Sequence, residues 1–157
     1  MTALTFHDVL PADAWAPRRV RHRLRAWLEE LCWPGDDADD LILAVNEAVS
    51  NVVDHAYPAD EIGFVWVDAS LTDAPDGSPR LSVIVADNGR WQEPASDPGY
   101  RQRGIRLMRG VTEFLHIDGG HRGTRVEMTS QPSQRVDLPD PAPLTSSDEV
   151  WRSTSSA

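Results

Sequence analysis

The chain has 157 residues, 40% of them hydrophobic and 25% charged, which suits one globular domain with one core, so a second domain is not expected. Fifteen basic residues against twenty-five acidic ones make the formal net charge −10, so we expect neither nucleic acid nor an anionic membrane as a direct partner. All fifteen basic residues are arginine, which excludes a phosphate-loop lysine, a Schiff base and a lysine general base.

The first part of the sequence predicts a strand followed by two helices. Residues 4–10 alternate apolar and polar side chains, as a half-buried strand does. Over residues 17–33 apolar side chains recur at helical spacing, while five arginines lie mostly off that stripe. Acidic residues in "PGDDADD" (34–40) suit the start of a second helix, which runs to about Tyr57. Cys32 is the single cysteine and there is no signal-peptide pattern or long apolar run, so we expect a soluble, cytoplasmic protein.

The next part predicts strands around one short helix. Residues 64–71 and 80–87 are β-branched runs joined by a segment with Asp-Gly and two prolines, which is typical of an antiparallel hairpin. Residues 88–104 are rich in Gly, Pro, Asp and Arg and predict a mobile loop, followed by a short helix over residues 104–111. Two more strands, "EFLHID" and "TRVEMTS", lie on either side of a glycine-rich turn.

This order of elements predicts an α/β two-layer sandwich with a largely antiparallel sheet over residues 1–130. From Gln131 onward Pro, Ser, Thr and Asp dominate the sequence. Because such a segment buries too little apolar surface to offset the entropy of ordering, residues 131–157 predict a disordered tail.

Three polar residues, Glu47, Asn51 and His55, follow one another at steps of four along the second helix, beside its apolar stripe. This spacing places them at the seam between the helix and the sheet. A solvated helix flank would explain a lone glutamate and asparagine better, because polar flanks are normal on surface helices. Other segments therefore have to decide between a site and a solvated flank.

Two further segments favour a site. The strand "SVIVAD" ends in Asp87, and Asn88 and Gly89 follow at once, which places a carboxylate where the backbone turns sharply. Gly123 and Thr124 open the last strand, so a hydroxyl and a bare backbone are available there. Each of these segments alone is only a turn.

Taken together and in this order, "EAVSNVVDHAY", "DNG" and "GT" resemble the motifs of the GHKL (histidine kinase-like) ATPase superfamily, most closely its anti-sigma factor and serine-protein kinase branch. The resemblance covers about residues 4–130. It implies the Bergerat-type ATP-binding fold, a mostly antiparallel mixed sheet with helices on one face. It also implies ATP and Mg²⁺ as cofactors.

The resemblance implies a role for each matching residue. Asp87 would accept a hydrogen bond from the exocyclic amine of adenine, a donor that guanine lacks at that position. Gly89 would let the base lie against the backbone, and the Thr124 hydroxyl would bind a water shared with Asp87 and adenine. Asn51 would ligate Mg²⁺ through its carbonyl oxygen. Glu47 would be the general base that takes the proton from the attacking hydroxyl.

The lid segment departs from the superfamily pattern. Many members have a glycine-rich motif whose backbone amides cradle phosphate, whereas this chain has "PGYRQRGIRLM", with more arginine than glycine. Arginine also binds phosphate well, so nucleotide binding is still the better interpretation of this segment. From its place in the lid we expect Arg103, Gly104 and Ile105 to contact the nucleotide. A solvated arginine cluster or a contact for an acidic partner is the alternative.

The resemblance implies an anti-sigma factor and ATP-dependent protein serine kinase. Such a protein sequesters a sigma factor, phosphorylates an antagonist protein that carries the target serine, and forms a homodimer. The alternative is a non-catalytic interaction protein with a degenerate nucleotide site. A sensor histidine kinase would need a dimerisation helix pair upstream, and a gyrase-like or chaperone-like ATPase would need a further domain, so we expect neither.

Overall fold

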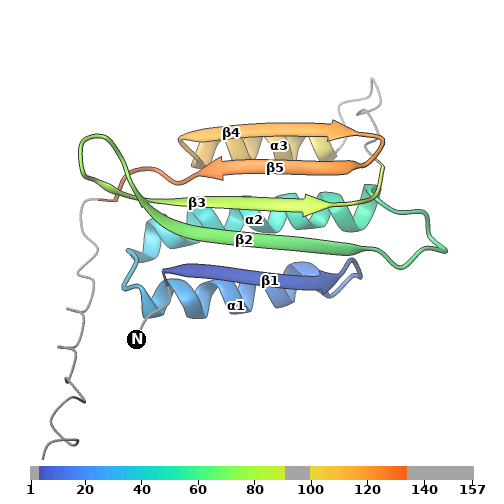
Figure 1. Ribbon diagram of the computed structural model, residues 1–157, viewed down its shortest axis with the longest axis horizontal. Helices are drawn as coiled ribbons and strands as arrows, with labels where there is room; N and C mark the ends of the chain where they lie inside the picture. The colour runs from blue at the N-terminus through green and yellow to red at the C-terminus, as the bar shows by residue number, and fades with distance from the viewer. Residues whose placement is uncertain (1–3, 91–99, 134–157) are drawn as a thin grey trace, which may run out of the picture.

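The protein is a five-stranded sheet with three helices on one face (Figure 1), in a computed structural model that describes residues 4–90 and 100–133. The strand order is β1-β2-β3-β5-β4, and all four pairings among these strands are antiparallel. The predicted two-layer sandwich with a mostly antiparallel sheet is therefore confirmed. The strands are β1 (Thr5–Pro11), β2 (Phe64–Asp73), β3 (Pro79–Asp87), β4 (Phe114–Gly120) and β5 (Gly123–Thr129).

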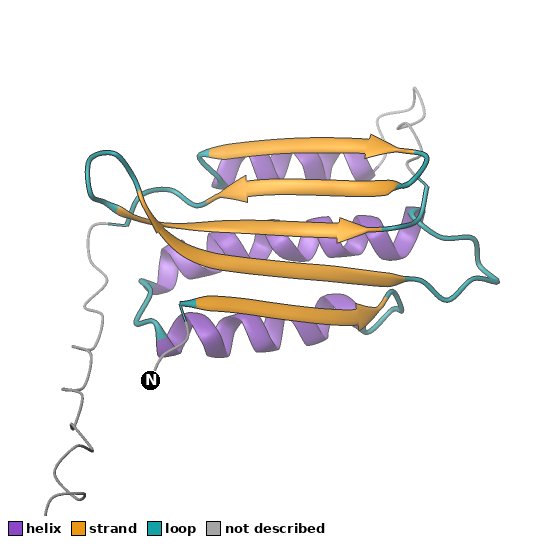
Figure 2. Ribbon diagram, in the orientation of Figure 1, coloured by secondary structure: helices purple, strands orange, loops and turns teal. Residues whose placement is uncertain are grey.

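The helix layer consists of α1 (Ala16–Glu30), α2 (Gly35–His55) and α3 (Tyr100–Val111), all behind the sheet in Figure 2. α2 lies in the middle of this layer and contacts both α1 and α3. It begins without a side-chain cap, but Asp36 and Asp37 lie in its first turn, where acidic residues interact favourably with the helix dipole. None of the helices in the described ranges is long and apolar enough to cross a membrane.

The third helix begins earlier than the sequence predicts, at Tyr100 instead of residue 104. Arginine and glutamine are good helix formers, and they fill this first turn. Gly104, which suggested the end of a loop, is a buried position inside the helix. The glycine there reflects a close contact with α2 and does not break the helix.

The core lies between the sheet and the helices. On β3 every second residue, from Leu81 through Val83 and Val85, faces the helix layer and is buried. On α2, Val45 and Val49 are fully buried against this face. Each fully buried aliphatic side chain contributes roughly 1.5–3 kcal/mol relative to an exposed one. This alternation also points the last residue of β3, Asp87, toward α2.

The described chain continues past β5 beside the first residues of β3. The Ser130 amide donates to the Leu81 carbonyl at 2.9 Å, and the Ser133 amide donates to the Pro79 carbonyl at 3.0 Å. The greater part of the predicted disordered tail, from residue 134 to 157, lies outside the described residues. Its disorder stays a prediction.

Candidate functional site

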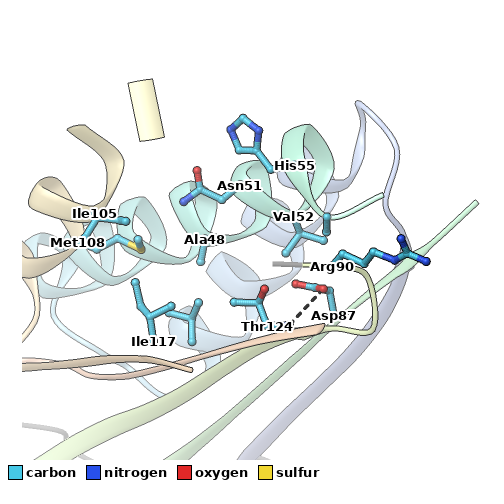
Figure 3. Close-up of a pocket in the computed structure, with 12 residues that line it drawn as sticks. Ala48, Asn51, Val52, His55, Asp87, Arg90, Ile105, Met108, Ile117 and Thr124 are labelled. Carbon is cyan, nitrogen blue, oxygen red and sulfur yellow. Dashed lines mark hydrogen bonds between the residues drawn. The ribbon is translucent and has the colours of Figure 1, made fainter. Parts of the chain in front are cut away.

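A pocket opens between α2 and the sheet, beside the end of β3 (Figure 3). Its empty volume is about 390 Å³, part of which is open solvent. Apolar side chains dominate the lining and a few polar groups converge on it, which is usual for small-molecule sites. The apolar lining comprises Ala48, Val52, Ala56, Ile105, Met108, Ile117 and Val126, and the polar lining Asn51, His55, Asp87, Arg90 and Thr124.

Asp87 is a buried carboxylate in this pocket, with only 7% of its surface exposed. Its Oδ1 accepts hydrogen bonds from the Gly89 amide at 2.9 Å and the Thr124 amide at 3.3 Å. These two bonds connect the turn after β3 to the start of β5 and fix the orientation of the carboxylate. In Figure 3 the carboxylate and the Thr124 hydroxyl both point toward the space beneath α2.

Gly89 lies against the end of α2. A β-carbon at this position would be 2.1 Å from the Ala56 carbonyl oxygen, so no larger residue fits without moving the backbone. The next amide, that of Arg90, donates to the same oxygen at 2.9 Å. The resemblance implies that Gly89 also lets a base lie against the backbone, and that role stays a prediction; the contact in the structure is with the end of the helix.

Gly123 is tightly constrained on the other side of Asp87. Its φ of +120° lies in a region that other residues rarely adopt, and a β-carbon there would be 2.0 Å from the Asp87 carbonyl oxygen. The close approach brings Thr124 within hydrogen-bonding distance of the Asp87 carboxylate. Both glycines therefore serve the geometry of the turn around Asp87.

The polar row on α2 lies along one side of the pocket. Asn51 and His55 line it, as the predicted seam position requires. Glu47 lies one helical turn before Asn51 on α2 and is partly buried, at the side where α3 begins. Its Oε2 would be 2.8 Å from a β-carbon at Gly104, and the Asn51 amide nitrogen would be 3.9 Å from it. Glu47, Asn51 and Gly104 therefore meet where α2 and α3 cross.

The three predicted lid residues have different positions. Ile105 lines the pocket, Gly104 is buried against α2, and Arg103 is exposed on α3 outside the pocket lining. The segment before them, residues 91–99, lies outside the described residues. Contact between Arg103 and a phosphate stays a prediction.

The residues present fit a metal ion that is held mainly by its substrate. In the described ranges no group of three or more His, Cys, Asp and Glu side chains comes together. Asn51 offers a single hard oxygen beside the pocket. Mg²⁺ usually keeps several waters and binds one or two protein ligands together with substrate phosphates, so this donor set suits it.

The sequence did not identify the inner wall of the pocket. Met108 projects from α3, while Ile117 and Val126 face each other across the β4–β5 pair. Helical spacing in α3 and alternation in β4 indicate buried positions, but neither pattern tells which buried side chains border a pocket. Only the pairing of β5 with β3 brings this wall opposite α2.

Residues 10–130 match a family described as the histidine kinase-like ATPase domain. A segment of 70 residues is 39% identical to the serine-protein kinase RsbW of Bacillus licheniformis, covering 45% of this chain and 41% of that protein. A segment of 80 residues is 31% identical to RsbW of Bacillus mycoides (strain KBAB4), covering 51% of this chain and 46% of that protein.

A solved structure has the same fold. The crystal structure of the RsbU and RsbW domains of Rv1364c from Mycobacterium tuberculosis superposes with a TM-score of 0.63 and 32% sequence identity. The match covers 83% of this chain and 32% of that one. The chain spans less than half the length of the curated relatives it matches.

Proposed function

The chain belongs to the histidine kinase-like ATPase family, and we propose that it binds ATP in the pocket beneath α2 and transfers the terminal phosphoryl group to a serine of a partner protein. One observation carries this proposal. The buried carboxylate of Asp87 lies at the end of β3 with its orientation fixed by two amides, opposite the polar row of α2. A base recognised at Asp87 would leave its phosphates room to extend toward Asn51 and Glu47.

Adenine recognition follows from the chemistry of Asp87. A carboxylate is an acceptor, so it pairs with the exocyclic amine of adenine and not with the carbonyl that guanine has at that position. Val52, Met108 and Ile117 supply apolar surface for the faces of the ring. The amide of Thr124 lies 3.3 Å from the Asp87 carboxylate, and its hydroxyl would join a water between Asp87 and the base.

Phosphoryl transfer would use the other end of the row. Glu47 would accept the proton of the serine hydroxyl while the serine oxygen bonds to the γ-phosphorus. The bond between the γ-phosphorus and the bridging oxygen breaks at the same time, and ADP leaves. Mg²⁺, when bound, supplies positive charge to the phosphates. Asn51 would hold the metal through its amide oxygen, while the apolar wall excludes water.

The partners follow from the resemblance to the anti-sigma and serine-protein kinase branch and from the two RsbW relatives. We propose a sigma factor as the sequestered partner, an antagonist protein with the target serine as the phosphorylated one, and a homodimer as the working assembly. The cytoplasm is the compartment in which these partners meet.

A second candidate is sequestration without catalysis. It is favoured by the position of Arg103, which is exposed and lies outside the pocket lining. If the arginines of α3 do not bind phosphate, the site would bind nucleotide weakly and transfer phosphate slowly. Sequestration of the sigma factor would then not depend on ATP turnover.

The test is incubation of the full chain with γ-labelled ATP, Mg²⁺ and candidate antagonist proteins, followed by mass spectrometry of the antagonist. Phosphoserine that requires ATP, Mg²⁺ and an intact Glu47 supports the kinase. ATP binding with no phosphoserine on any antagonist favours sequestration without catalysis. Absence of ATP binding by calorimetry would contradict both the kinase and the nucleotide site.

A further inference from the structure

The hydroxyl of Tyr57 occupies the place where the β2–β3 ladder would continue. The last pair of this ladder is Val65 with Asp87, so one more step would place Phe64 opposite Asn88. Instead, the Asn88 amide donates to the Tyr57 hydroxyl at 3.2 Å, and this hydroxyl lies 2.6 Å from the Phe64 carbonyl oxygen. The hydroxyl thus separates the two strands immediately beyond Asp87.

The same hydroxyl also lies 2.7 Å from Oδ1 of the Asn88 side chain. It has one proton, so it donates to either the Phe64 carbonyl or the Asn88 amide oxygen while it accepts from the Asn88 amide. Burial raises the pKa of the Tyr57 phenol above its ordinary value. The hydroxyl therefore keeps its proton at neutral pH and remains a donor.

The tyrosine ring is held by the backbone of a glycine. A β-carbon at Gly63 would lie 2.1 Å from the ring, so only glycine allows the ring to lie on the chain that enters β2. Gly63 is buried by this contact, and its carbonyl accepts a hydrogen bond from the Ala12 amide at 2.8 Å. Tyr57 therefore joins the end of α2 to the chain that leads into β2.

Separation of the strands decides what the turn after Asp87 does. Released from the ladder, the chain bends toward α2, where Gly89 touches the Ala56 carbonyl and the Arg90 amide bonds to it. The same bend brings the Gly89 amide back to the Asp87 carboxylate at 2.9 Å. Ala56 and Tyr57, adjacent in the sequence, thus both hold the turn, Ala56 through Gly89 and Arg90 and Tyr57 through Asn88.

We propose that Tyr57 is a positioning residue for base recognition: its hydroxyl ends the β2–β3 ladder at Asp87 and thereby sets the orientation of the carboxylate that reads the base. Tyr57 does not line the pocket and acts only through the turn. The inference rests on the proposed function, because the base is the adenine of ATP.

The first test needs no nucleotide. Tyr57→Phe keeps the ring on Gly63 and removes only the hydroxyl. Amide hydrogen exchange should become faster at Gly89 and Arg90, by roughly three- to tenfold for loss of one hydrogen bond, while the core strands keep their protection. Unchanged exchange at both amides would overturn the inference whether or not the protein binds ATP.

The second test measures base discrimination. Calorimetry compares ATP with the triphosphate of purine riboside, which has the same ring and phosphates but no exocyclic amine. In Tyr57→Phe the affinity for ATP should fall roughly three- to tenfold while that for the analogue changes less than about twofold, because only the contact with Asp87 is disturbed. A purely structural role would lower both affinities together, and that result would overturn the inference.

Ser130→Ala is the matched control. The Ser130 hydroxyl accepts from the Leu81 amide at 3.0 Å and donates to the Gln131 carbonyl at 2.8 Å, a similar bridge at the opposite end of β3. This variant should retain the ratio of the ATP affinity to the analogue affinity and the exchange rates at Gly89 and Arg90.

The outcomes distinguish the inference from the proposed function. A wild type that binds neither nucleotide would overturn the proposed function together with the inference. An unchanged ratio of the two affinities in Tyr57→Phe would overturn the inference alone.

Discussion

Gly104 and Glu47 are in such close contact that a β-carbon on the glycine would lie 2.8 Å from Oε2 of the glutamate. The contact joins α3 to the polar row of α2 at the point where phosphoryl transfer is proposed. The nearest atom is the end of a flexible side chain, so an added methyl group would displace the carboxylate more easily than it would displace the helix.

Gly104→Ala should therefore separate stability from catalysis. We expect the melting temperature to stay the same or rise, because alanine is a better helix former than glycine, while phosphoryl transfer falls by on the order of tenfold or more. Gly110→Ala is the control, since that glycine is in the same helix and, apart from the backbone of the helix itself and its chain neighbours, nothing lies within 4 Å of its β-carbon position. It should stabilise the protein by roughly 0.5–1 kcal/mol and leave transfer unchanged. Equal transfer in both variants would contradict the importance of the Gly104–Glu47 contact.

Glu47→Ala and Asn51→Ala should affect different steps. Loss of a general base should lower phosphoryl transfer by about 10² to 10⁴ with little effect on ATP affinity. Loss of the metal ligand should also weaken ATP binding in the presence of Mg²⁺, because the metal contacts the phosphates in the bound ground state as well. Calorimetry with and without Mg²⁺ and a phosphoserine assay on the antagonist measure the two effects. Full transfer in Glu47→Ala would exclude it as the base.

Asp87→Asn should weaken ATP binding by about 1.5–3 kcal/mol, because a charge-assisted hydrogen bond becomes a neutral one. The asparagine oxygen can still accept from the Gly89 and Thr124 amides, so the turn should keep its shape. Asp118→Asn, an exposed change on β4, controls for the loss of one negative charge. If the two variants bind ATP equally well in calorimetric titration, Asp87 does not contact the base.

Gly123→Ala should destabilise the fold, whereas Gly120→Ala on the same hairpin should not. A β-carbon at Gly123 would meet the Asp87 backbone oxygen, and its φ of +120° strains any other residue. Strain of this kind costs on the order of 1–3 kcal/mol. At Gly120, nothing beyond the glycine and its chain neighbours lies within 4 Å of the β-carbon position. Urea unfolding curves of the two variants give the comparison, and similar midpoints would contradict the close approach of β5 to Asp87.

The raised pKa of Tyr57 predicts a loss of stability at alkaline pH. Burial disfavours the phenolate in the folded chain, so the contribution of Tyr57 is complete below the unfolded-state pKa near 10 and is lost as the pH rises through the higher folded-state value. The chain has no lysine, so few other groups titrate there. Melting curves between pH 8 and 11 should show a steeper decline for wild type than for Tyr57→Phe. Parallel declines would mean that Tyr57 titrates normally.

The sequence by itself determined the order and kind of the elements and most of the polar groups around the pocket. Alternation in β3 and helical spacing in α2 are local patterns, and they place Asp87 and Asn51 on the faces that the structure brings together. The family followed from these motifs in order, and the match over residues 10–130 confirms it.

Only the tertiary structure decided how the elements meet. No local pattern shows that Gly104 touches Glu47, that Ile117 faces Val126, or that the Tyr57 hydroxyl separates Phe64 from Asn88. These contacts join segments that are distant in the sequence, and they depend on strand register and on how closely two helices approach. Register and helix approach are set by the packing of the whole core, so a short stretch of sequence that specifies its own helix or strand does not specify them.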